Sequence, residues 1–514
     1  MRWKPLLKKR EKWAGGAHLR RSITRMVGTV GEETQWGYPI SRVLCEKWEV
    51  RAAPEEGVRL SHGKAGRVDR TKLTWMKTLS HYARTRNRCT LVDACNRKAK
   101  SGRTTMRLRL LLALTITATT NIDVFARTII YVPSDQPTIQ AAINAAHNGD
   151  SVVVSPGTYL ENIDFLGKAI TVKSANGPSH TTIQGNSGSV TVRFSSGERT
   201  NSVLKGFTLS GAGVPLTTGV LILNSSPTVL GNRITANHWC DGAGISVTGG
   251  SPIIRNNVIT GNFHDQCSGG IGGGGIAIIG GANARIIGNV ISGNDGGNGF
   301  GGGGISVDAG GSPTIMNNII RNNTVETSGG AITTFNGTDA LIVQNLIYNN
   351  NAPQGPGIYF LVPSGAHGPT LVNNTIIGGT GSTQGTAVFA SGFDDQVQFY
   401  NNLLIGLSGQ NAVYCDSTYG LAPPTFTNSD AFSQGGTGLS GTCAGQSGAN
   451  GNISVDPQFV SKNRKLSPGS PAIDAGTNSA PNLPGKDLAG KPRIVDGNND
   501  GIATVDLGAY EYQP

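Results

Sequence analysis

The stretch that decides the fold runs from Ser225 to Leu404 and repeats one phrase seven times. The copies read SPTVLGNRITAN, SPIIRNNVITGN, ANARIIGNVISGN, SPTIMNNIIRNN, TDALIVQNLIYNN, GPTLVNNTIIGG and QVQFYNNLLIGL. Each copy carries one Asn with a large apolar residue two positions later, and these Asn residues are Asn232, Asn257, Asn289, Asn318, Asn345, Asn374 and Asn402. The steps between them range from 25 to 32 residues. A fixed motif with variable spacing indicates stacked coils, whose strands must coincide while the loops between them need not.

Two short apolar strands flank each Asn, and a third strand follows a loop of variable length, as in GISV, GIAI and GIYF. Three strands of period two in each coil predict an all-β fold, the right-handed parallel β-helix. We expect the Asn itself to take the left-handed backbone conformation that a sharp turn between strands requires. Stacked coils also place the Asn amides above one another, where they can form a hydrogen-bonded ladder. A second Asn predicts another ladder and recurs at Asn237, Asn262, Asn294, Asn323 and Asn350.

Charge divides the chain into two parts. Residues 1–126 hold 27 of the 43 Lys and Arg but only 10 of the 32 Asp and Glu, a net charge of +17. The remaining 388 residues hold 16 Lys and Arg and 22 Asp and Glu, a net charge of −6. A basic block raises the question of nucleic-acid binding. However, residues 1–105 contain no zinc-ligand spacing, no helix-turn-helix pattern and no sustained hydrophobic period, so we expect no nucleic-acid partner.

An internal signal peptide begins at Met106. The sequence MRLRLLLALTITATTNIDVFA has a short charged start, an apolar run and a small-residue cleavage site that ends at Ala126. We therefore expect residues 1–105 to be translated upstream sequence or a disordered extension, and residues 106–126 to be removed on export. The mature protein would be secreted or held at the outer surface. The apolar run is too short to predict a membrane span.

A capping helix is predicted at the start of the mature chain. Ile139, Ala142 and Ile143 fall on one helical face, which would cover the open apolar end of the first coil. With TIQAAINAA, GDSVVVSPGTY and GKAITVKS, the chain resembles the secreted pectin-lyase-like β-helix superfamily. The resemblance implies a β-helix over residues 127–460. It leaves the activity open, because this superfamily includes pectate lyases, polygalacturonases, epimerases and phage spikes.

Residues 461–514 form a separate pattern. LSPGSPAIDAG and the final LGAYEY resemble the terminal segment of bacterial surface β-helix proteins, and we expect this segment to cap the helix. Within it, DGNNDGIATVD places oxygen-bearing side chains at alternate positions, as a calcium loop does, although its last acidic residue comes one place early. Calcium and a solvated Asx-rich turn both stay open, and we expect no other cofactor. The calcium ligands would be Asp496, Asn498, Asp500 and Asp506.

Four cysteines follow the signal peptide. Cys240 and Cys267 fall in the loops of consecutive coils, so we expect a disulfide between them in an exported chain. The alternative is a metal site that these two cysteines share with the His residues of the same loops. Cys415 and Cys443 predict a second disulfide, which would tie down the loop-rich segment 415–455.

The outward face of the third strand is the expected binding surface, because the substrate cleft of pectin-lyase-like enzymes runs along one parallel sheet. Glycoside hydrolysis needs a pair of carboxyl groups, and lyase chemistry needs a base together with charge neutralisation. The outward row lacks carboxylates, and no Lys or Arg lies between Arg321 and Lys462 to hold an acidic sugar. Its hydroxyl and aromatic side chains predict glycan binding instead, and they are Ser246, Ser306, Thr333, Tyr359 and Phe389.

Acids and histidines gather in the loops of three consecutive coils, which we expect to lie before the third strand. If the chain is an enzyme, they are the candidate catalytic residues: His238, Asp241, His264, Asp265, Asp295 and Asp308. The alternative is that they are ordinary polar residues in the loops of an acidic surface protein. The leading hypothesis is an exported protein that binds a polysaccharide or cell-surface glycan along its coils. The alternatives are a polysaccharide lyase, glycoside hydrolase or epimerase, and a purely structural or adhesive solenoid. The oligomeric state stays open.

Overall fold

The computed structural model describes residues 127–186, 188–213, 216–264, 270–308, 310–363, 366–391, 397–418, 423–460 and 464–514. The predicted signal peptide and the segment before it lie outside these ranges. The described residues belong to one compact unit, Thr117–Pro514. Within them, every helix is too short or too polar to cross a membrane.

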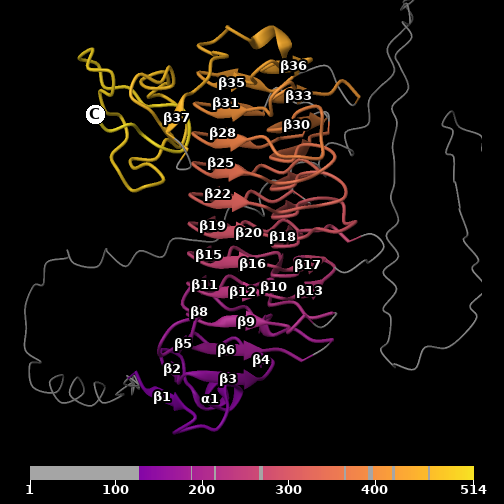
Figure 1. The fold of residues 1–514 in the computed structure, drawn as a ribbon. Helices are drawn as coiled ribbons and strands as arrows, with labels where there is room; N and C mark the ends of the chain where they lie inside the picture. Colours follow the sequence, from indigo (N-terminus) through magenta and orange to yellow (C-terminus); the bar gives the residue numbers. More distant parts are fainter. Residues whose placement is uncertain are drawn as a thin grey trace, which may run out of the picture. The chain divides into compact units, whose positions relative to one another are not determined.

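The chain winds into a stack of coils, and each complete coil adds one parallel strand to each of three sheets (Figure 1). This arrangement confirms the predicted right-handed parallel β-helix. Two short additional pairs accompany the three sheets: β13 (His238–Trp239) with β17 (Phe263–His264), and β37 (Phe459–Val460) with β38 (Lys465–Leu466).

In each of the three sheets, the strands stack in the order of the sequence. Sheet 1 holds β1 (Ile129–Val132), β2 (Ser151–Val154), β5 (Thr171–Ser174), β8 (Val203–Lys205), β11 (Thr228–Leu230), β15 (Ile253–Arg255), β19 (Arg285–Ile287), β22 (Thr314–Met316), β25 (Leu341–Val343), β28 (Thr370–Val372), β31 (Gln398–Tyr400) and β34 (Thr425–Thr427). Sheet 2 holds β3 (Gly157–Leu160), β6 (Thr181–Gln184), β9 (Thr208–Ser210), β12 (Arg233–Thr235), β16 (Val258–Thr260), β20 (Val290–Ser292), β23 (Ile319–Arg321), β26 (Leu346–Tyr348), β29 (Thr375–Ile377), β32 (Leu403–Ile405) and β35 (Asp430–Phe432). Sheet 3 holds β4 (Ile163–Asp164), β7 (Val192–Phe194), β10 (Val220–Leu223), β14 (Ile245–Thr248), β18 (Ile276–Ile279), β21 (Ile305–Val307), β24 (Ile332–Thr334), β27 (Ile358–Leu361), β30 (Val388–Ser391), β33 (Val413–Cys415) and β36 (Leu439–Gly441).

The core is a column of stacked aliphatic side chains. Successive side chains of a strand point to opposite faces, so the middle residue of each three-residue strand in sheet 2 faces inward. Burying one such side chain contributes about 1.5–3 kcal/mol. The apolar residue two places after each ladder Asn is this core residue. All seven of these residues pair in register and are fully buried: Ile234, Ile259, Ile291, Ile320, Ile347, Ile376 and Leu404.

Both predicted Asn ladders are present. In the first ladder, each amide nitrogen donates to the amide oxygen of the Asn in the next coil at 3.0–3.2 Å, from Asn232 to Asn402. The second ladder runs from Asn237 to Asn350 at 2.9–3.0 Å. Each amide of the first ladder also donates to a backbone carbonyl of the preceding coil. The ladders therefore satisfy both hydrogens of each amide inside the core.

The left-handed turn residue is the one before each ladder Asn, and our expectation that the Asn itself adopts this conformation was wrong. The ladder Asn has to direct its side chain into the core, whereas the preceding residue reverses the chain and directs its own side chain outward. Gly and Asn enter the left-handed region at the lowest cost. The turn residues have φ angles of 52–66° and are Gly231, Asn256, Gly288, Asn317, Gln344, Asn373 and Asn401.

A short helix covers the first coil, as predicted. Helix α1 (Ile139–Ala145) buries Ile139, Ala142 and Ile143 against the core column. Thr138 begins the helix, because its hydroxyl accepts a hydrogen bond from the backbone N–H of Ala141 at 3.1 Å. Such a cap contributes about 1 kcal/mol.

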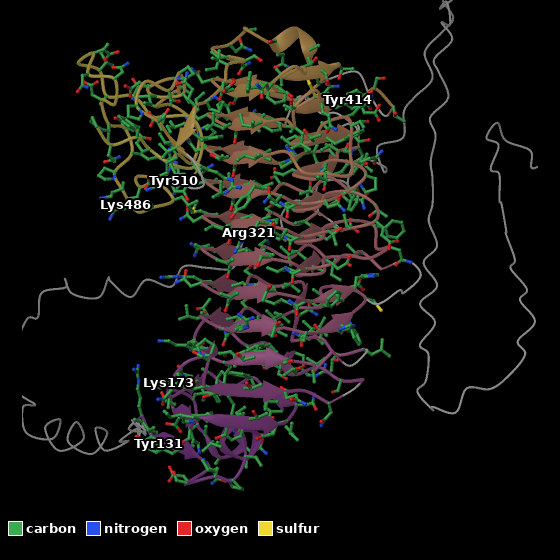
Figure 2. The ribbon with its side chains drawn as sticks, in the orientation of Figure 1. Tyr131, Lys173, Arg321, Tyr414, Lys486 and Tyr510 are labelled. Atoms are coloured by element: carbon green, nitrogen blue, oxygen red, sulfur yellow. A yellow bond between two sulfur atoms is a disulfide. The ribbon has the colours of Figure 1, made fainter. Side chains whose placement is uncertain are left out.

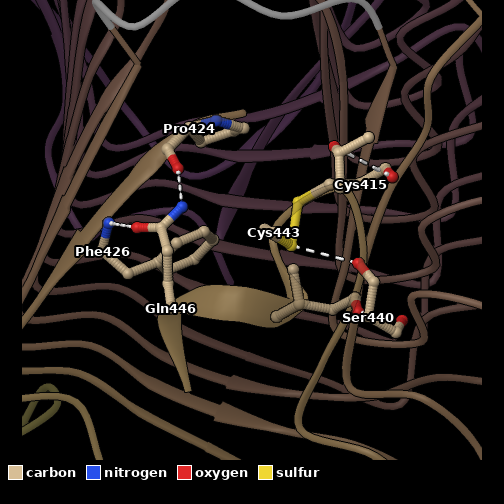
Figure 3. Close-up of a disulfide and its surroundings, with 8 residues drawn as sticks. Cys415, Pro424, Phe426, Ser440, Cys443 and Gln446 are labelled. Atoms are coloured by element: carbon tan, nitrogen blue, oxygen red, sulfur yellow. Dashed lines mark hydrogen bonds between the residues drawn. A yellow bond between two sulfur atoms is a disulfide. The ribbon is translucent and has the colours of Figure 1, made fainter. Parts of the chain in front are cut away.

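The last coil is closed by the segment around the Cys415–Cys443 disulfide, which is confirmed with a Cα–Cα distance of 5.7 Å (Figure 3). The bridge is followed by a 3-10 turn, η2 (Ala444–Gln446). The Gln446 amide bonds the backbone of Phe426 and Pro424, at 2.9 and 2.6 Å. This turn, and not the C-terminal segment, closes that end of the stack.

The C-terminal segment lies along the side of the later coils, so its predicted capping role was wrong. The outward amides of the turn residues bind its backbone: Asn428 donates to the carbonyl of Ala475 at 3.1 Å, and Asn401 to that of Thr477 at 3.0 Å. Asn373 donates to the carbonyl oxygens of residues 506 and 508. The left-handed turns thus have two functions, since they reverse the chain and also hold the C-terminal segment.

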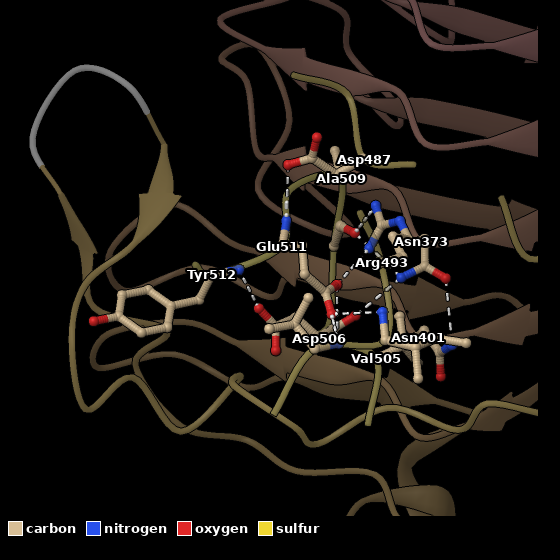
Figure 4. A network of polar contacts seen from close by, with 12 residues as sticks. Asn373, Asn401, Asp487, Arg493, Val505, Asp506, Ala509, Glu511 and Tyr512 are labelled. Carbon is tan, nitrogen blue, oxygen red and sulfur yellow. Dashed lines mark hydrogen bonds and ion pairs between the residues drawn. The ribbon is translucent and has the colours of Figure 1, made fainter. Parts of the chain in front are cut away.

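A buried charged cluster anchors this segment (Figure 4). The side chains of Arg493 and Glu511 are fully buried and lie 3.2 Å apart. The Arg493 Nε donates to Gln344 of a coil turn at 2.8 Å. Burial, together with the nearby charge of Glu511, raises the pKa of Asp506 to about 7. Removing one partner from a buried pair leaves an uncompensated charge, so we expect this cluster to fix the position of the segment.

Candidate functional site

The outward face of sheet 3, predicted to bind a glycan, is buried. Ser306 and Thr333 have no exposed surface, and Ser246 is 4% exposed. The Ser306 hydroxyl donates to the carbonyl of Ile271 at 3.0 Å, and that of Thr333 to the carbonyl of Ser328 at 2.8 Å. Gly-rich loops before each strand therefore cover this face and use its hydroxyl groups. In this structure the predicted glycan-binding hydroxyl groups therefore contact protein and not solvent.

The aromatic residues of the same row pack against one another. Tyr359 and Phe389 are 8% and 6% exposed, and their ring centroids lie 5.7 Å apart. Phe389 also contacts the ring of Tyr414 at 5.1 Å, and Tyr359 contacts Phe335 at 6.0 Å. These rings form a stack along the coils and stabilise them. They are not arranged as an open platform for a sugar.

A different row of side chains runs along the outside of six consecutive coils. Each member directly follows the position of the second ladder Asn, and neighbouring members pair through parallel bridges. We call this set the loop row: His238, Phe263, Asp295, Thr324, Asn351 and Thr380. The next residue along the chain faces the other way and is buried, as at His264, Val325 and Ala352. Stacking places successive members about 4.8 Å apart.

The loop row combines aromatic and hydrogen-bonding groups. Phe263 is 43% exposed, and its ring lies 5.1 Å from that of His238. Asn351 donates to the Thr324 hydroxyl at 3.1 Å and accepts from the Thr380 hydroxyl at 3.0 Å. Asn351 and Thr380 are exposed, whereas His238, Asp295 and Thr324 are half-buried. The row therefore offers an aromatic surface at one end and a chain of hydroxyl and amide groups at the other.

The structure separates the candidate catalytic acids. Asp241 lies in the loop before β14, where one carboxylate oxygen accepts the backbone N–H of Ile271 at 2.7 Å. Asp295 lies in the loop before β21 and accepts the N–H of Gly297 at 2.8 Å. Asp308 follows β21, so it lies at the other end of that strand and not in the loops, contrary to our expectation. Its carboxylate accepts a hydrogen bond from the Asn336 amide.

The remaining members of the predicted loop cluster are only partly described. His264 is 6% exposed and pairs with Trp239 in the short β13–β17 ladder. Asp265 and Cys267 lie outside the described residues. Cys240 is disulfide-bonded, so its sulfur is not a thiolate that could bind a metal. Among the residues that the structure describes, no three His, Cys, Asp or Glu side chains are grouped as metal ligands.

The candidate calcium ligands fall into two places. Asp496 and Asp500 accept backbone N–H groups within their own loop, and Asn498 donates to Asp500 at 3.0 Å, which is an Asx-rich turn. Asp506 instead lies in the buried cluster, where its carboxylate accepts the N–H groups of Asp474 and Tyr512. The structure therefore does not bring Asp506 to the other three.

The loop row could have been predicted from its sequence position, although its residue composition does not indicate it. Phe263, Thr324 and Asn351 each come directly after an Asn of the second ladder. Because that Asn faces inward, the next residue in extended backbone must face outward. The signal is therefore positional: it depends on register, and the residue types differ from coil to coil.

A comparison with protein-family models agrees with this fold. Residues 218–404 match the family model described as a right handed beta helix region. Similar solved structures include pectate lyase Pel9A, with 16% identity over 76% of this chain and 97% of that chain and a TM-score of 0.39. They also include XylC in complex with xylose, with 12% identity over 65% of this chain and 87% of that chain and a TM-score of 0.42. A third is the A-module of the Azotobacter vinelandii mannuronan C-5 epimerase AlgE6, with 17% identity over 62% of this chain and 95% of that chain and a TM-score of 0.38. No curated protein sequence matches this chain.

Proposed function

We propose that this chain is an exported protein that binds a neutral glycan along the loop row. The observation that carries the proposal is the row itself, in which partly or fully exposed side chains follow one register position through six coils. A linear polymer can lie along such a row and contact one coil after another. Extended concave or flat surfaces of this kind are how solenoid proteins bind their partners.

The side chains of the loop row have the chemistry of sugar recognition. The exposed Phe263 ring can stack on the apolar face of a pyranose, since aromatic side chains present a large rigid surface at low entropic cost. Thr324 and Asn351 can hydrogen-bond sugar hydroxyls, because hydroxyl and amide groups both donate and accept.

The charges of the row favour a neutral sugar. Asp295 contributes a carboxylate, and the row contains no Lys or Arg. An acidic sugar would meet this carboxylate without a compensating cation, and like charges at close range oppose binding. The same lack of a cation argues against lyase or epimerase chemistry on an acidic polysaccharide at this row.

Export rests on the sequence from Met106 to Ala126. Its charged start, apolar run and small-residue end are those of a signal peptide. The disulfides at Cys240 and between Cys415 and Cys443 support an oxidising compartment. N-terminal sequencing of protein recovered from the culture medium tests this step, and a mature N-terminus after Ala126 is expected.

A glycan panel tests the binding proposal. We expect the full chain to bind one or more neutral glycans, and Phe263→Ala to weaken that binding roughly 3- to 10-fold through loss of ring stacking. Asn351→Ala should weaken it by a similar factor through loss of a hydrogen bond. Tyr131→Ala is the matched control, because Tyr131 is 46% exposed on β1, at the first coils (Figure 2). It should leave binding unchanged.

Two results would contradict the proposal. One is an absence of binding across the panel, which would favour a purely structural role. The other is turnover, measured as new reducing ends or ultraviolet-absorbing products and abolished by Asp241→Asn or Asp295→Asn. That outcome would establish an enzyme whose acids lie in the loops.

A further inference from the structure

A cavity lies between the C-terminal segment and the outside of the coils that hold β20 and β23. Its volume is about 380 Å³, which is within the range of small-molecule sites, about 300–1,000 Å³. The turns and strands of the coils line one side, and residues 465, 488–489 and 510 of the C-terminal segment line the other. The loop row lies beyond the opposite end of the sheet 2 strands, so this cavity is separate from the proposed glycan surface.

The coil side of the cavity is aliphatic. Val290 and Ile319 are the first residues of β20 and β23, and they pair in register. Both side chains point outward, because the next residue of each strand is buried in the core column. Leu346 continues this register position in β26 and is buried, whereas Val290 and Ile319 are half-buried. The cavity therefore contains an apolar surface that a ligand can cover.

A tight turn of the C-terminal segment forms the facing wall. The N–H of Gly490 donates to the carbonyl of Asp487 at 2.9 Å, which closes a β-turn. The N–H of Lys491 donates to the buried carboxylate of Asp487 at 2.7 Å and fixes the turn further. Leu488 and Ala489 occupy the two central positions of this turn and line the cavity. The wall is therefore formed before any ligand binds.

The amide groups in the cavity offer a hydrogen-bond donor. The Asn317 oxygen accepts the amide of Gln344 at 2.8 Å, and the Gln344 oxygen accepts the Arg493 Nε at 2.8 Å, so both amides have a fixed orientation. Among the residues that the structure describes, the NH₂ group of Asn317 has no partner. Asn289 also lines the cavity, but its amide hydrogens are used in the first ladder.

A cation accompanies this donor. The Lys465 ammonium lies over the ring of Tyr510, 5.5 Å from its centroid, which is a cation–π arrangement. Lys465 has no carboxylate partner within the described part of the chain. Burial raises the pKa of the Tyr510 hydroxyl, so this group stays protonated and can donate as well (Figure 2). None of the residues that line the cavity is acidic, so its polar side favours an anion.

We propose that this cavity binds a small amphipathic carboxylate. The carboxylate group accepts hydrogen bonds from Lys465 and Asn317, and bonds between charged groups of this kind are the stronger ones. The apolar body of the ligand lies on Val290 and Ile319 and removes their aliphatic surface from water. A sugar fits this site poorly, because its hydroxyl groups lose their hydrogen bonds to water against the aliphatic side.

Titration of the full chain with hexanoate tests the proposal, with ligand-observed NMR as the measurement. Acetate keeps the charge without the apolar body, and 1-hexanol keeps the body without the charge. We expect hexanoate to bind at least about 10-fold more tightly than either one. Lys465→Gln should weaken hexanoate binding roughly 3- to 10-fold and leave 1-hexanol binding unchanged. Lys465 is exposed, so this variant should fold normally.

Two further variants locate the ligand. Ala489→Trp fills the cavity from an exposed position of the turn and should abolish the binding of both hexanoate and 1-hexanol. Lys486→Gln is the matched control, because it removes the same charge from an exposed position of the same segment that does not line the cavity (Figure 2). It should keep the affinity of the parent chain.

Three results would overturn the proposal. The first is hexanoate binding no tighter than acetate binding. The second is an equal loss of hexanoate affinity in Lys465→Gln and Lys486→Gln, which would indicate a general effect of charge. The third is undiminished binding by an Ala489→Trp variant whose circular dichroism spectrum matches that of the parent. The basic residues before position 127 are common to all variants, so differences between variants report on the cavity.

Discussion

Deleting one internal rung of the first Asn ladder should destabilise the whole solenoid. The Asn318 amide donates to Asn345 at 3.0 Å and to the carbonyl of Ile286 at 2.9 Å. Its oxygen accepts the backbone N–H of Asn289 at 2.8 Å and the amide of the same residue at 3.0 Å. Asn318→Ala removes all four bonds and leaves two buried donors of Asn289 without partners.

The expected cost follows from those two donors. Each unsatisfied buried donor costs about 1–3 kcal/mol, so for the two donors of Asn289 we expect the free energy of unfolding to fall by about 2–6 kcal/mol. Urea unfolding followed by far-ultraviolet circular dichroism measures it, with the m-value as a check that unfolding remains cooperative. Asn298→Ala is the control, because Asn298 is exposed, and it should change stability by less than about 0.5 kcal/mol. A loss below about 1 kcal/mol for Asn318→Ala would refute the structural role of the ladder.

Three further predictions concern the end of the chain. Burial raises the pKa of Asp430 to about 7, so between pH 3.8 and about 7 the folded protein binds one more proton than the unfolded chain. The free energy of unfolding therefore falls as the pH rises through this window. Asp430→Asn should reduce this pH dependence by about 1.4 kcal/mol per pH unit, measured by denaturant titrations at several pH values. Arg493→Met leaves Glu511 buried without its partner, so the free energy of unfolding should fall by about 3–5 kcal/mol. Hydrogen exchange in residues 476–511 should become faster. Unchanged exchange in these residues would contradict the anchoring role of the cluster. Replacing Cys415 and Cys443 by Ser opens a loop with a sequence separation of 28 and should cost about 3 kcal/mol, measured by thermal unfolding, whereas an unchanged midpoint would show that the bridge is dispensable.

The repeat predicted the coil because the same few residues of each copy determine both the strand register and the buried core positions. Each Asn fixes an inward amide, and the apolar residue two places later fixes a core position, as Ile234 and Ile259 do. The coverage of sheet 3 could not be predicted in this way. It depends on Gly-rich loops that approach the strand closely: a Cβ at Gly301 would lie 2.7 Å from the Thr333 hydroxyl oxygen. No periodic pattern in the sequence reports such an approach.

The position of the C-terminal segment was also beyond sequence reasoning. Asn373 and Asp506 are 133 residues apart, and nothing local to either residue indicates that they meet. The preference of Asn for the left-handed conformation explains why Asn occurs at the turn position of residue 373. This preference alone would also allow the side chain to face solvent. Only the three-dimensional arrangement shows that the outward amides of the later turns bind the segment.

Hydroxyl-radical footprinting of Phe263 tests the central claim most directly, using the neutral glycan that binds best in the panel. Phe263, Phe300 and Tyr131 are 43%, 61% and 46% exposed, so all three should be oxidised in the free protein. The account predicts that the bound glycan protects Phe263 and leaves Tyr131 as reactive as before. Equal oxidation of Phe263 with and without bound glycan would show that the glycan binds elsewhere, and would contradict the loop row as the binding site.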